Sequence, residues 1–418
     1  MEIWTIENLG PLVQGFEKLD ISSQSHLLQQ MNEKFPPAVF RSHLTKRHKA
    51  MKSVTACQNV LNGATQQFPP FTPWHDLPDS PLNLKGYGLV FTAGGEGERL
   101  RLSLLARGED PKALEDFTKA TYPLQNFCNN FGALHINLAL IASYCKNFNL
   151  DIPVIITTGP KGSVTERVIP EVLSKNSNFG LKHVVTIPQD ERLHFTMDDR
   201  ITFTMKNGLP VTVTHPDETG GPLMKLKQKP SPDKPSCIEW LESLGCSKLI
   251  LAQATAIYDQ RLLPVMASAA QKHDCLGVGV MRDTFEPNDP FGTFVTIKKD
   301  NNESTCIIEQ GVRNETSRKI KDSNNRYFLP FNTGLYALDC DLLQKSDLPD
   351  YATPPKEVLP DLPKSPKVGY AATDILPLAK KPLILTVDPK MFAVIKTAED
   401  LSVLAEAARG FGLEEICG

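Results

Sequence analysis

YGLVFTAGGEGERLR, residues 87–101, joins a short apolar run to three glycines and then to a helix-like pattern. An apolar run of this length that ends in glycines is typical of a buried strand. Glycine has no Cβ atom, so Gly94, Gly95 and Gly97 would let the backbone approach a ligand closely. A loop of this kind at a helix N-terminus suits a phosphate group, whereas a plain strand-to-helix turn would need the same glycines for its shape alone.

Further strands and helices alternate on the C-terminal side of this stretch. The strands are predicted at 152–159, 183–189 and 247–253, and the helices at 122–145 and 163–175. Strands that alternate with helices indicate βαβ units. We therefore expect an α/β protein with a mixed, mostly parallel, doubly wound sheet, whose ligands lie beyond the carboxyl ends of the strands.

The remaining segments predict a helical N-terminal lobe and a small C-terminal lobe. Apolar residues at helical spacing and then a proline-rich connector occupy 1–84, the central domain covers 85–380, and the C-terminal lobe covers 381–418. Two alternating stretches predict β-hairpins at 198–214 and 291–310. The proline- and lysine-rich stretch at 348–367 predicts an exposed loop.

Composition limits the classes of partner. The chain has 418 residues, 41% of them hydrophobic, and a formal net charge of −3, which gives no basic excess for nucleic acid or a membrane surface. Its nine cysteines are scattered singly, without CxxC pairs or zinc spacing, which fits reduced thiols in a cytoplasmic protein. No signal peptide or apolar membrane span is expected.

Two common glycine motifs do not fit the loop. A dinucleotide-binding GxGxxG counted from Gly95 meets Leu100 where its third glycine should stand, so a dehydrogenase is disfavoured. The P-loop string GxxxxGK[ST] does not occur in the chain. The loop instead resembles the L-x-G-G-x-G-T-R-L signature of nucleotidyltransferases.

Further segments resemble motifs of the same enzymes, in the same order. They are TKATYPLQNF (118–127), IPVIITTGPKGS (152–163), FGLKHVVTIPQDERL (179–193), HPDETGGPLMKL (215–226), FNTG (331–334) and VIKTAEDL (394–401). Each is individually weak, but together they make the chain similar to the eukaryotic-type UDP-sugar pyrophosphorylases over roughly residues 87–401. The resemblance implies a GT-A-like, Rossmann-type nucleotidyltransferase that joins UTP to a sugar 1-phosphate, with Mg²⁺ as the expected cofactor.

The resemblance also implies roles for individual residues. The nucleotide phosphates would be held by Gly94, Gly95, Gly97 and Arg99, and catalysis would use Lys119 and Lys396 with Arg99. Lys112, in EDPKALEDF, is the rival of Lys119, which we prefer because YPL follows it. Uracil would be read by Gln189, Gly220 and Gly221, and the sugar would be bound by Gly292, Glu309 and Asn332. Taken alone, Lys396 and Glu309 would be read as solvated surface residues.

The chain departs from the family pattern at two positions. The strand matching LILAQATAI usually ends in Asp-Asn, whose aspartate helps to hold the metal, but here Thr255 and Ala256 follow. The metal ligands are therefore unknown: the metal would be held mainly by the substrate, be recruited by Asp217, Asp259 or another acid, or be bound poorly. Glu98 also stands where threonine is usual, beside the phosphates.

These departures keep a second hypothesis open, a non-catalytic relative that binds a nucleotide sugar and acts as a regulatory or interaction protein. The sugar is not determined, because HPDETGG favours N-acetylhexosamine and VIKTAEDL favours glucose. Nothing in the sequence indicates an oligomeric state.

Overall fold

The computed structural model describes residues 2–95, 97–124, 127–285, 289, 291–299, 302–355, 357 and 364–417, without the side chains of 54–60, 62 and 129. The chain forms two compact units. The smaller unit contains Met1–Val60, Asp190–Gly221 and Leu348–Ala372, and the larger unit contains Leu61–Gln189, Pro222–Asp347 and Thr373–Gly418.

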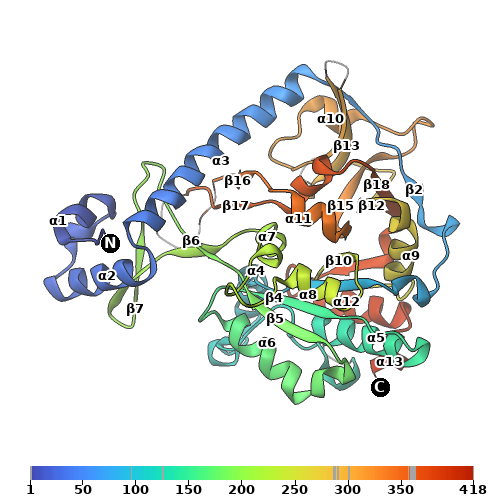
Figure 1. Cartoon of the computed structure of the whole chain (residues 1–418), viewed down its shortest axis with the longest axis horizontal. Helices are drawn as coiled ribbons and strands as arrows, with labels where there is room; N and C mark the ends of the chain where they lie inside the picture. The colour runs from blue at the N-terminus through green and yellow to red at the C-terminus, as the bar shows by residue number, and fades with distance from the viewer. Residues whose placement is uncertain are drawn as a thin grey trace. The chain divides into compact units, whose positions relative to one another are not determined.

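The larger unit is built on an eleven-stranded sheet with the central order β2-β18-β12-β15-β10-β3-β4-β5 (Figure 1). Pairs along this path are parallel except those of β15, which is antiparallel to both neighbours. The mixed, mostly parallel sheet of the prediction is therefore confirmed. The strands on this path are β2 (Thr72–Pro73), β3 (Tyr87–Thr92), β4 (Val154–Thr158), β5 (Val184–Pro188), β10 (Lys248–Gln253), β12 (Cys275–Arg282), β15 (Phe328–Asp339) and β18 (Pro382–Val387). A further strand, β13 (Thr293–Lys299), pairs with β15 and also with β1 (Thr65–Gln67) and β14 (Asn302–Ile308).

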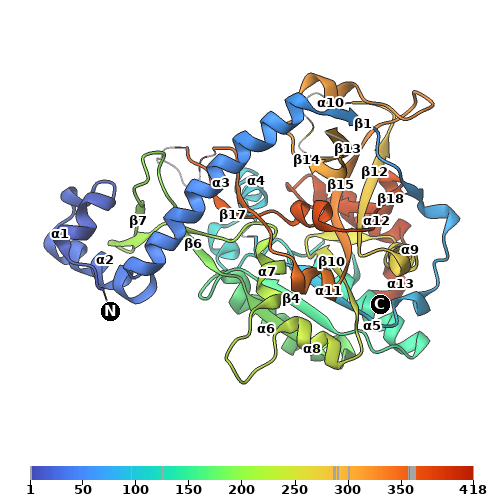
Figure 2. The ribbon, with the colours of Figure 1, turned by 45° about the horizontal axis from the view of Figure 1, so that its top comes forward.

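Helices of the larger unit pack on this sheet around one large apolar core. All five residues of β4 are buried, as expected for a strand that is covered on both faces. Helices α5 and α13 contact each other and lie side by side in Figures 1 and 2. The helices are α4 (Glu98–Ala106), α5 (Ala133–Phe148), α6 (Val164–Lys175), α7 (Gly221–Lys227), α8 (Cys237–Ser243), α9 (Leu262–Ala269), α10 (Glu315–Lys319), α11 (Cys340–Lys345), α12 (Asp400–Gly410) and α13 (Glu414–Cys417), and β11 (Ala256–Tyr258) pairs with β19 (Phe392–Val394).

The smaller unit has its own core, in which Trp4, Leu27 and Met31 pack against Phe195 and Ile201. The predicted N-terminal helices are therefore confirmed, but they fold together with two later segments of the chain. The elements are α1 (Ile6–Leu9), α2 (Ile21–Lys34), α3 (Pro37–Gly63), β6 (Glu191–Leu193), β7 (Phe203–Lys206), β8 (Leu209–Thr212), β9 (Thr214–Pro216), β16 (Asp350–Ala352) and β17 (Val368–Tyr370).

Several sequence predictions are corrected by this architecture. The C-terminal segment 381–418 is not a separate lobe, because β18 pairs with β12 inside the main sheet. The helix predicted at 122–145 begins only at Ala133, because a loop in which Leu124 N donates to Phe131 O precedes it. The stretch 348–367 is not simply an exposed loop: β16 pairs with β17, and Ser365 is fully buried. Residues 356 and 358–363 of that stretch lie outside the described residues.

Both predicted hairpins are confirmed. β7 pairs with β8 across Asn207-Gly208, whose φ angles of 52° and 78° suit a tight hairpin turn. β13 pairs with β14, and Asp300 and Asn301 of the tip lie outside the described residues.

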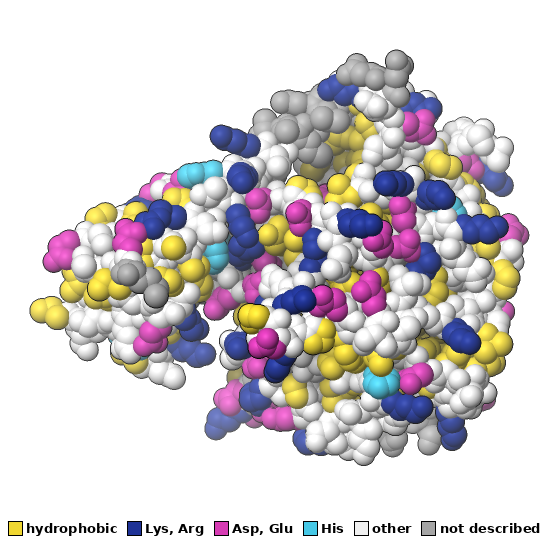
Figure 3. All heavy atoms as spheres, viewed as in Figure 1, with side chains coloured by type: hydrophobic (Ala, Val, Ile, Leu, Met, Phe, Trp, Pro, Cys, Tyr) yellow, Lys and Arg dark blue, Asp and Glu magenta, His cyan; other side chains and the backbone are white. Residues whose placement is uncertain are grey.

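In the part of the chain that the structure describes, no helix combines the length and the apolar character that a membrane crossing requires. On the face displayed in Figure 3, basic and acidic side chains are interspersed, so neither sign of charge dominates that face.

Buried histidines predict an acid-sensitive smaller unit. Burial lowers the pKa of His43 and His194 to about 4 and that of His215 to about 3. In the unfolded chain these histidines have a pKa of roughly 6.5, so below that pH the unfolded chain binds more protons than the folded one. The free energy of unfolding is therefore at its full value above about pH 6.5 and decreases as the pH falls towards 4. We expect a loss on the order of a few kcal/mol.

Trp4 is the one tryptophan of this unit, since Trp74 and Trp240 lie in the larger one. A Trp74→Phe, Trp240→Phe variant therefore allows its melting to be followed by Trp4 fluorescence from pH 7.5 to 4.5. A melting temperature that does not change over this range would contradict the expectation.

Candidate functional site

The glycine loop lies at the carboxyl end of β3. Ala93 N donates to Thr157 O (2.8 Å) and Ala254 N donates to Thr92 O (3.1 Å), so this loop is tied to the ends of both neighbouring strands. Because β10, β3, β4 and β5 are parallel, their carboxyl ends meet at one edge of the sheet. The predicted strand, loop and helix are confirmed, with α4 starting directly after Gly97.

Gly94 and Gln189 are brought together at this edge. An ideal Cβ on Gly94 would lie 2.4 Å from Gln189 Nε2 and 3.1 Å from Thr158 O, so a larger residue there would have to displace the Gln189 amide. Gln189 N donates to Thr158 O (3.2 Å), and its side chain is buried. Gln189 therefore directly follows β5, and its buried side chain lies against Gly94. Gly95 is exposed, with open space around an ideal Cβ.

Gly97 contacts Lys119 from the other side. Its φ of +70° is a left-handed conformation, and an ideal Cβ would lie 2.8 Å from Lys119 Cβ and 3.0 Å from Phe117 Cε1. Lys119 is half-buried there, whereas Lys112 is exposed. The contact supports Lys119 over its rival.

Lys119, Arg99 and Lys396 form a cluster of positive charge. The pKa of Lys119 is lowered to about 8, chiefly by burial and then by the charges of Arg99 and Lys396, against which Asp400 acts. Burial and Arg99 likewise lower the pKa of Lys396, with Asp289 and Asp400 opposing. Cations that lower one another's pKa stabilise a bound anion, so the cluster suits a polyphosphate.

Lys396 links this cluster to a second group of residues. Its Nζ lies 3.5 Å from the centroid of the Phe291 ring, which stacks on Phe331 at 4.8 Å. Phe291 is followed directly by Gly292, one of the residues expected to contact the sugar.

Gly292, Glu309 and Asn332 also lie together. An ideal Cβ on Gly292 would lie 3.2 Å from Glu309 Oε1, and Asn332 N donates to Gly292 O (2.7 Å). Asn332 Oδ1 accepts from Tyr336 OH (3.1 Å) and from Gly334 N (3.0 Å). Glu309 is not a solvated surface residue, because it is partly buried and burial raises its pKa.

Asp374 was not predicted from the sequence. Burial, followed by the negative charge of Glu309, raises the pKa of Asp374 to about 6. Its neighbourhood, AATDILP, carries no spacing that would have separated it from other acidic residues.

Gly220 and Gly221 belong to the smaller unit. Gly220 N donates to Tyr370 O (2.7 Å), and an ideal Cβ there would lie 2.8 Å from two backbone carbons of Tyr370 and Ala371. The contacts account for the glycine at 220 by close backbone packing. A role of Gly220 and Gly221 in binding uracil stays a prediction.

The described residues at the site do not form a set of ligands for a metal ion. Thr255 and Ala256 provide no carboxylate, and the two candidate replacements are paired with arginines. Asp259 accepts two hydrogen bonds from the Arg261 side chain (2.9 and 2.7 Å), and Asp217 is ion-paired with Arg192 in the smaller unit. Within the described ranges, no three His, Cys, Asp or Glu side chains are grouped as metal ligands.

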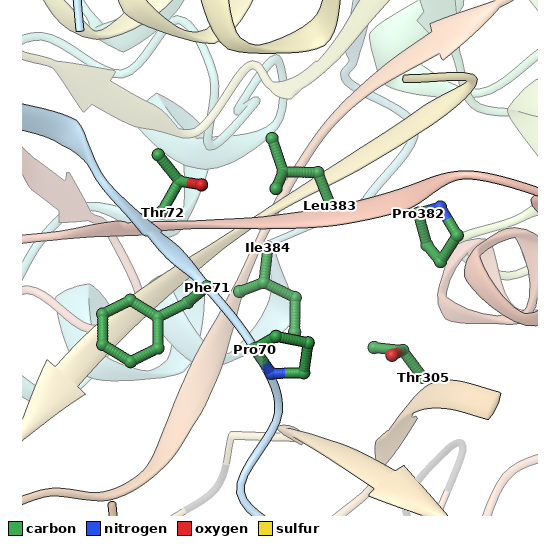
Figure 4. Close-up of a pocket in the computed structure, with 7 residues that line it drawn as sticks. All are labelled: Pro70, Phe71, Thr72, Thr305, Pro382, Leu383 and Ile384. Carbon is green, nitrogen blue, oxygen red and sulfur yellow. The ribbon is translucent and has the colours of Figure 1, made fainter. Parts of the chain in front are cut away.

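A small pocket elsewhere does not fit a nucleotide. Figure 4 shows its lining, which is mainly apolar and has no charged side chain: Pro70, Phe71, Thr72, Thr305, Pro382, Leu383 and Ile384. It lies at the amino end of β18, whereas ligands of parallel sheets bind at the carboxyl ends.

The fold is a mixed α/β fold of the nucleotidyltransferase-like kind, and it is similar to the fold of solved UDP-sugar pyrophosphorylases. A UDP-N-acetylglucosamine pyrophosphorylase from Trypanosoma brucei is similar over 97% of this chain and 82% of its own, with a TM-score of 0.69 and 13% identity.

Two mutant forms of UDP-glucose pyrophosphorylase from Leishmania major are similar at lower TM-scores. One matches with a TM-score of 0.62 and 14% identity, over 92% of this chain and 78% of its own. The other, solved in complex with UDP-glucose, matches with a TM-score of 0.58 and 13% identity, over 92% of this chain and 79% of its own. No family model and no curated protein sequence matches this chain.

Proposed function

We propose that this protein is a uridylyltransferase that forms a UDP-sugar and pyrophosphate from UTP and a sugar 1-phosphate. The observation that carries the proposal is the cluster of Lys119, Arg99 and Lys396 around the glycine loop. Two half-buried lysines beside an exposed arginine, with no ion pair to any of the three among the described residues, are suited to a ligand with several negative charges.

In the proposed reaction a phosphate oxygen of the sugar 1-phosphate attacks the α-phosphorus of UTP, and pyrophosphate leaves. The attacking oxygen is already ionised, so no general base is needed, and catalysis rests on positioning and charge neutralisation. Lys119 would neutralise the charge that develops on the α-phosphate, while Arg99 and the backbone of the glycine loop hold the other phosphates.

The second group of residues would bind the sugar. Phe291 and Gly292 are consecutive, so the site that Lys396 contacts continues directly to Glu309 and Asn332. The Glu309 carboxylate can accept hydrogen bonds from sugar hydroxyls. The Asn332 side chain would donate through its amide nitrogen, because its oxygen already accepts from Tyr336 OH and Gly334 N. Glucose and N-acetylhexosamine remain alternatives for the sugar.

Mg²⁺ stays an expectation of the proposal. Among the described residues the site offers no set of metal ligands, so a magnesium ion would bind with the nucleotide and be held mainly by its phosphate oxygens. None of the roles given to Lys119, Arg99 or Lys396 depends on it.

Thr255 and Ala256 favour a second candidate, a non-catalytic relative that binds a nucleotide sugar. The two candidates are separated by measuring pyrophosphate release from UTP with a panel of sugar 1-phosphates, with and without Mg²⁺, and with ATP, CTP and GTP as controls. Release that requires UTP and one sugar 1-phosphate supports the enzyme. No release under any condition, together with calorimetric binding of UTP or a UDP-sugar, supports the non-catalytic relative.

The proposal also predicts how UTP binding depends on pH. With a pKa of about 8, Lys119 loses its charge as the pH rises through that value, and a bound polyphosphate favours the protonated form. UTP affinity should therefore fall above about pH 8, and binding near that pH should take up a proton. Calorimetry in two buffers with different ionisation enthalpies measures the uptake; equal binding enthalpies in both buffers would contradict it.

A further inference from the structure

The turn that carries Lys396 is held by a single carboxylate. Asp400 Oδ2 accepts hydrogen bonds from Lys396 N and Thr397 N, both at 2.7 Å, and from Thr397 Oγ1 at 3.3 Å. Asp400 is also the first residue of α12. The backbone at Lys396 is therefore fixed by a side chain only four residues along the chain.

The same turn is tied to α4, the helix that carries Arg99. Ala398 N donates to Ser103 Oγ (3.0 Å), and Arg107 donates to Ala398 O (3.3 Å) and to Glu399 Oε1 (2.7 Å). These bonds fix Lys396 relative to the helix that starts at the glycine loop. Asp400 thus completes a connection between two of the three cations.

Asp400 also acts on both lysines through its charge. It opposes the lowering of the pKa of Lys119 and of Lys396, whereas Arg99 lowers both. Asp289 also favours the charged form of Lys396, but Asp289 is ion-paired with Arg282. Of the described residues, Asp400 is the one acid whose charge acts on both members of the lysine pair.

We propose that Asp400 is a positioning residue, which holds the Lys396 turn in place and supplies the negative charge beside the lysine pair of the phosphate site. The inference rests on the proposed function, since Asp400 would position a lysine of the same phosphate site. It also explains how three cations can gather at the glycine loop before a ligand arrives.

The test is Asp400→Asn, with Glu406→Gln as the matched control. Asparagine keeps an oxygen that can accept the backbone N–H groups but has no charge. Glu406 is exposed on the same helix, so its variant removes the same charge at a position away from the turn. Should Asp400→Asn fail to fold, Asp400→Ser offers a neutral hydroxyl that can accept the N–H of Thr397.

The first readout is labelling of Lys119 by an amine-reactive reagent, quantified by mass spectrometry against pH. The neutral amine reacts, so loss of a neighbouring negative charge should raise labelling of Lys119 near pH 7.5 by roughly threefold or more in the folded Asp400→Asn protein. Lys396 should change in the same direction, and Glu406→Gln should match the wild type. An unchanged labelling profile of both lysines in a folded Asp400 variant would overturn the inference.

The second readout is the pH dependence of pyrophosphate release. The loss of activity at alkaline pH should begin at lower pH in Asp400→Asn than in the wild type, a change that a merely structural role would not produce. Because labelling needs no turnover, the two proposals fail separately. If Asp400→Asn shifts the labelling profile but the wild type releases no pyrophosphate, the role of Asp400 stands and the uridylyltransferase is refuted. If the wild type is active but the labelling profile of Asp400→Asn is unshifted, the uridylyltransferase stands and the role of Asp400 is refuted.

Discussion

Replacing Lys119 by alanine should lower kcat for UDP-sugar formation by about 10²–10³-fold, because the group that neutralises charge on the α-phosphate is lost. The fold should persist. Lys119 is half-buried, and burial and then the charges of Arg99 and Lys396 lower its pKa, so its removal relieves a desolvated charge and the repulsion with both cations. Thermal melting and pyrophosphate release measured on the same preparation separate the two effects.

Lys112→Ala is the matched control, since Lys112 is an exposed lysine only seven residues before Lys119. It should keep near wild-type turnover. Near wild-type turnover in Lys119→Ala, with a large loss in Lys112→Ala, would transfer the phosphate-bridging role to Lys112.

Gly97→Ala should reduce both stability and turnover. The left-handed φ of +70° costs alanine about 1–2 kcal/mol, and the new Cβ would lie 2.8 Å from Lys119 Cβ. The methyl group must therefore displace Lys119 from the phosphate site. We expect kcat/KM to fall about ten- to a hundredfold, which corresponds to about 1.4–2.8 kcal/mol of transition-state stabilisation.

Gly108→Ala separates backbone strain from the contact with Lys119. Gly108 lies just after α4, the helix that Gly97 precedes, and also has a left-handed φ, of +88°. An ideal Cβ on Gly108 has open space around it. It should lose similar stability and keep its turnover. Equal losses of turnover in the two variants would show that the effect of Gly97→Ala arises from strain and not from Lys119.

The elements that the sequence predicts well are those with a strong local pattern. β3, β4, β5 and β10 are short apolar runs bounded by turn residues, and their parallel pairing follows from the helices between them. Asn207-Gly208 marks its hairpin by turn chemistry alone. α5 was misplaced because the residues before Ala133 have a helix-like apolar spacing, although tertiary contacts hold them in a loop.

The partition into units could not be predicted in the same way. The smaller unit is assembled from three distant segments, and no composition change marks Asp190–Gly221 or Leu348–Ala372 as partners of the N-terminal helices. Their association rests on the packing of side chains such as Phe195 and Ile201 against Trp4 and Met31, which only the folded chain brings together.

The residues of the candidate site also differ in whether a local sequence pattern predicts them. Gly94, Gly97, Gln189, Lys119 and Lys396 are predicted because they lie in ordered family-like segments, and the structure brings them close to one another. Asp374 has no local signal, because a single acidic residue in a chain with 48 of them carries no positional information. Asp400 could have been found, since an aspartate three residues after a threonine in VIKTAEDL can bond back to the turn.

The reverse reaction tests the central claim most directly. The protein is incubated with radiolabelled pyrophosphate and either UDP-glucose or UDP-N-acetylglucosamine, with ADP-glucose as the control. The proposed uridylyltransferase predicts label in UTP with at least one UDP-sugar, none with ADP-glucose, and loss of the label in Lys119→Ala. Calorimetric binding of a UDP-sugar without any label in UTP would contradict it and leave a binding protein on this fold.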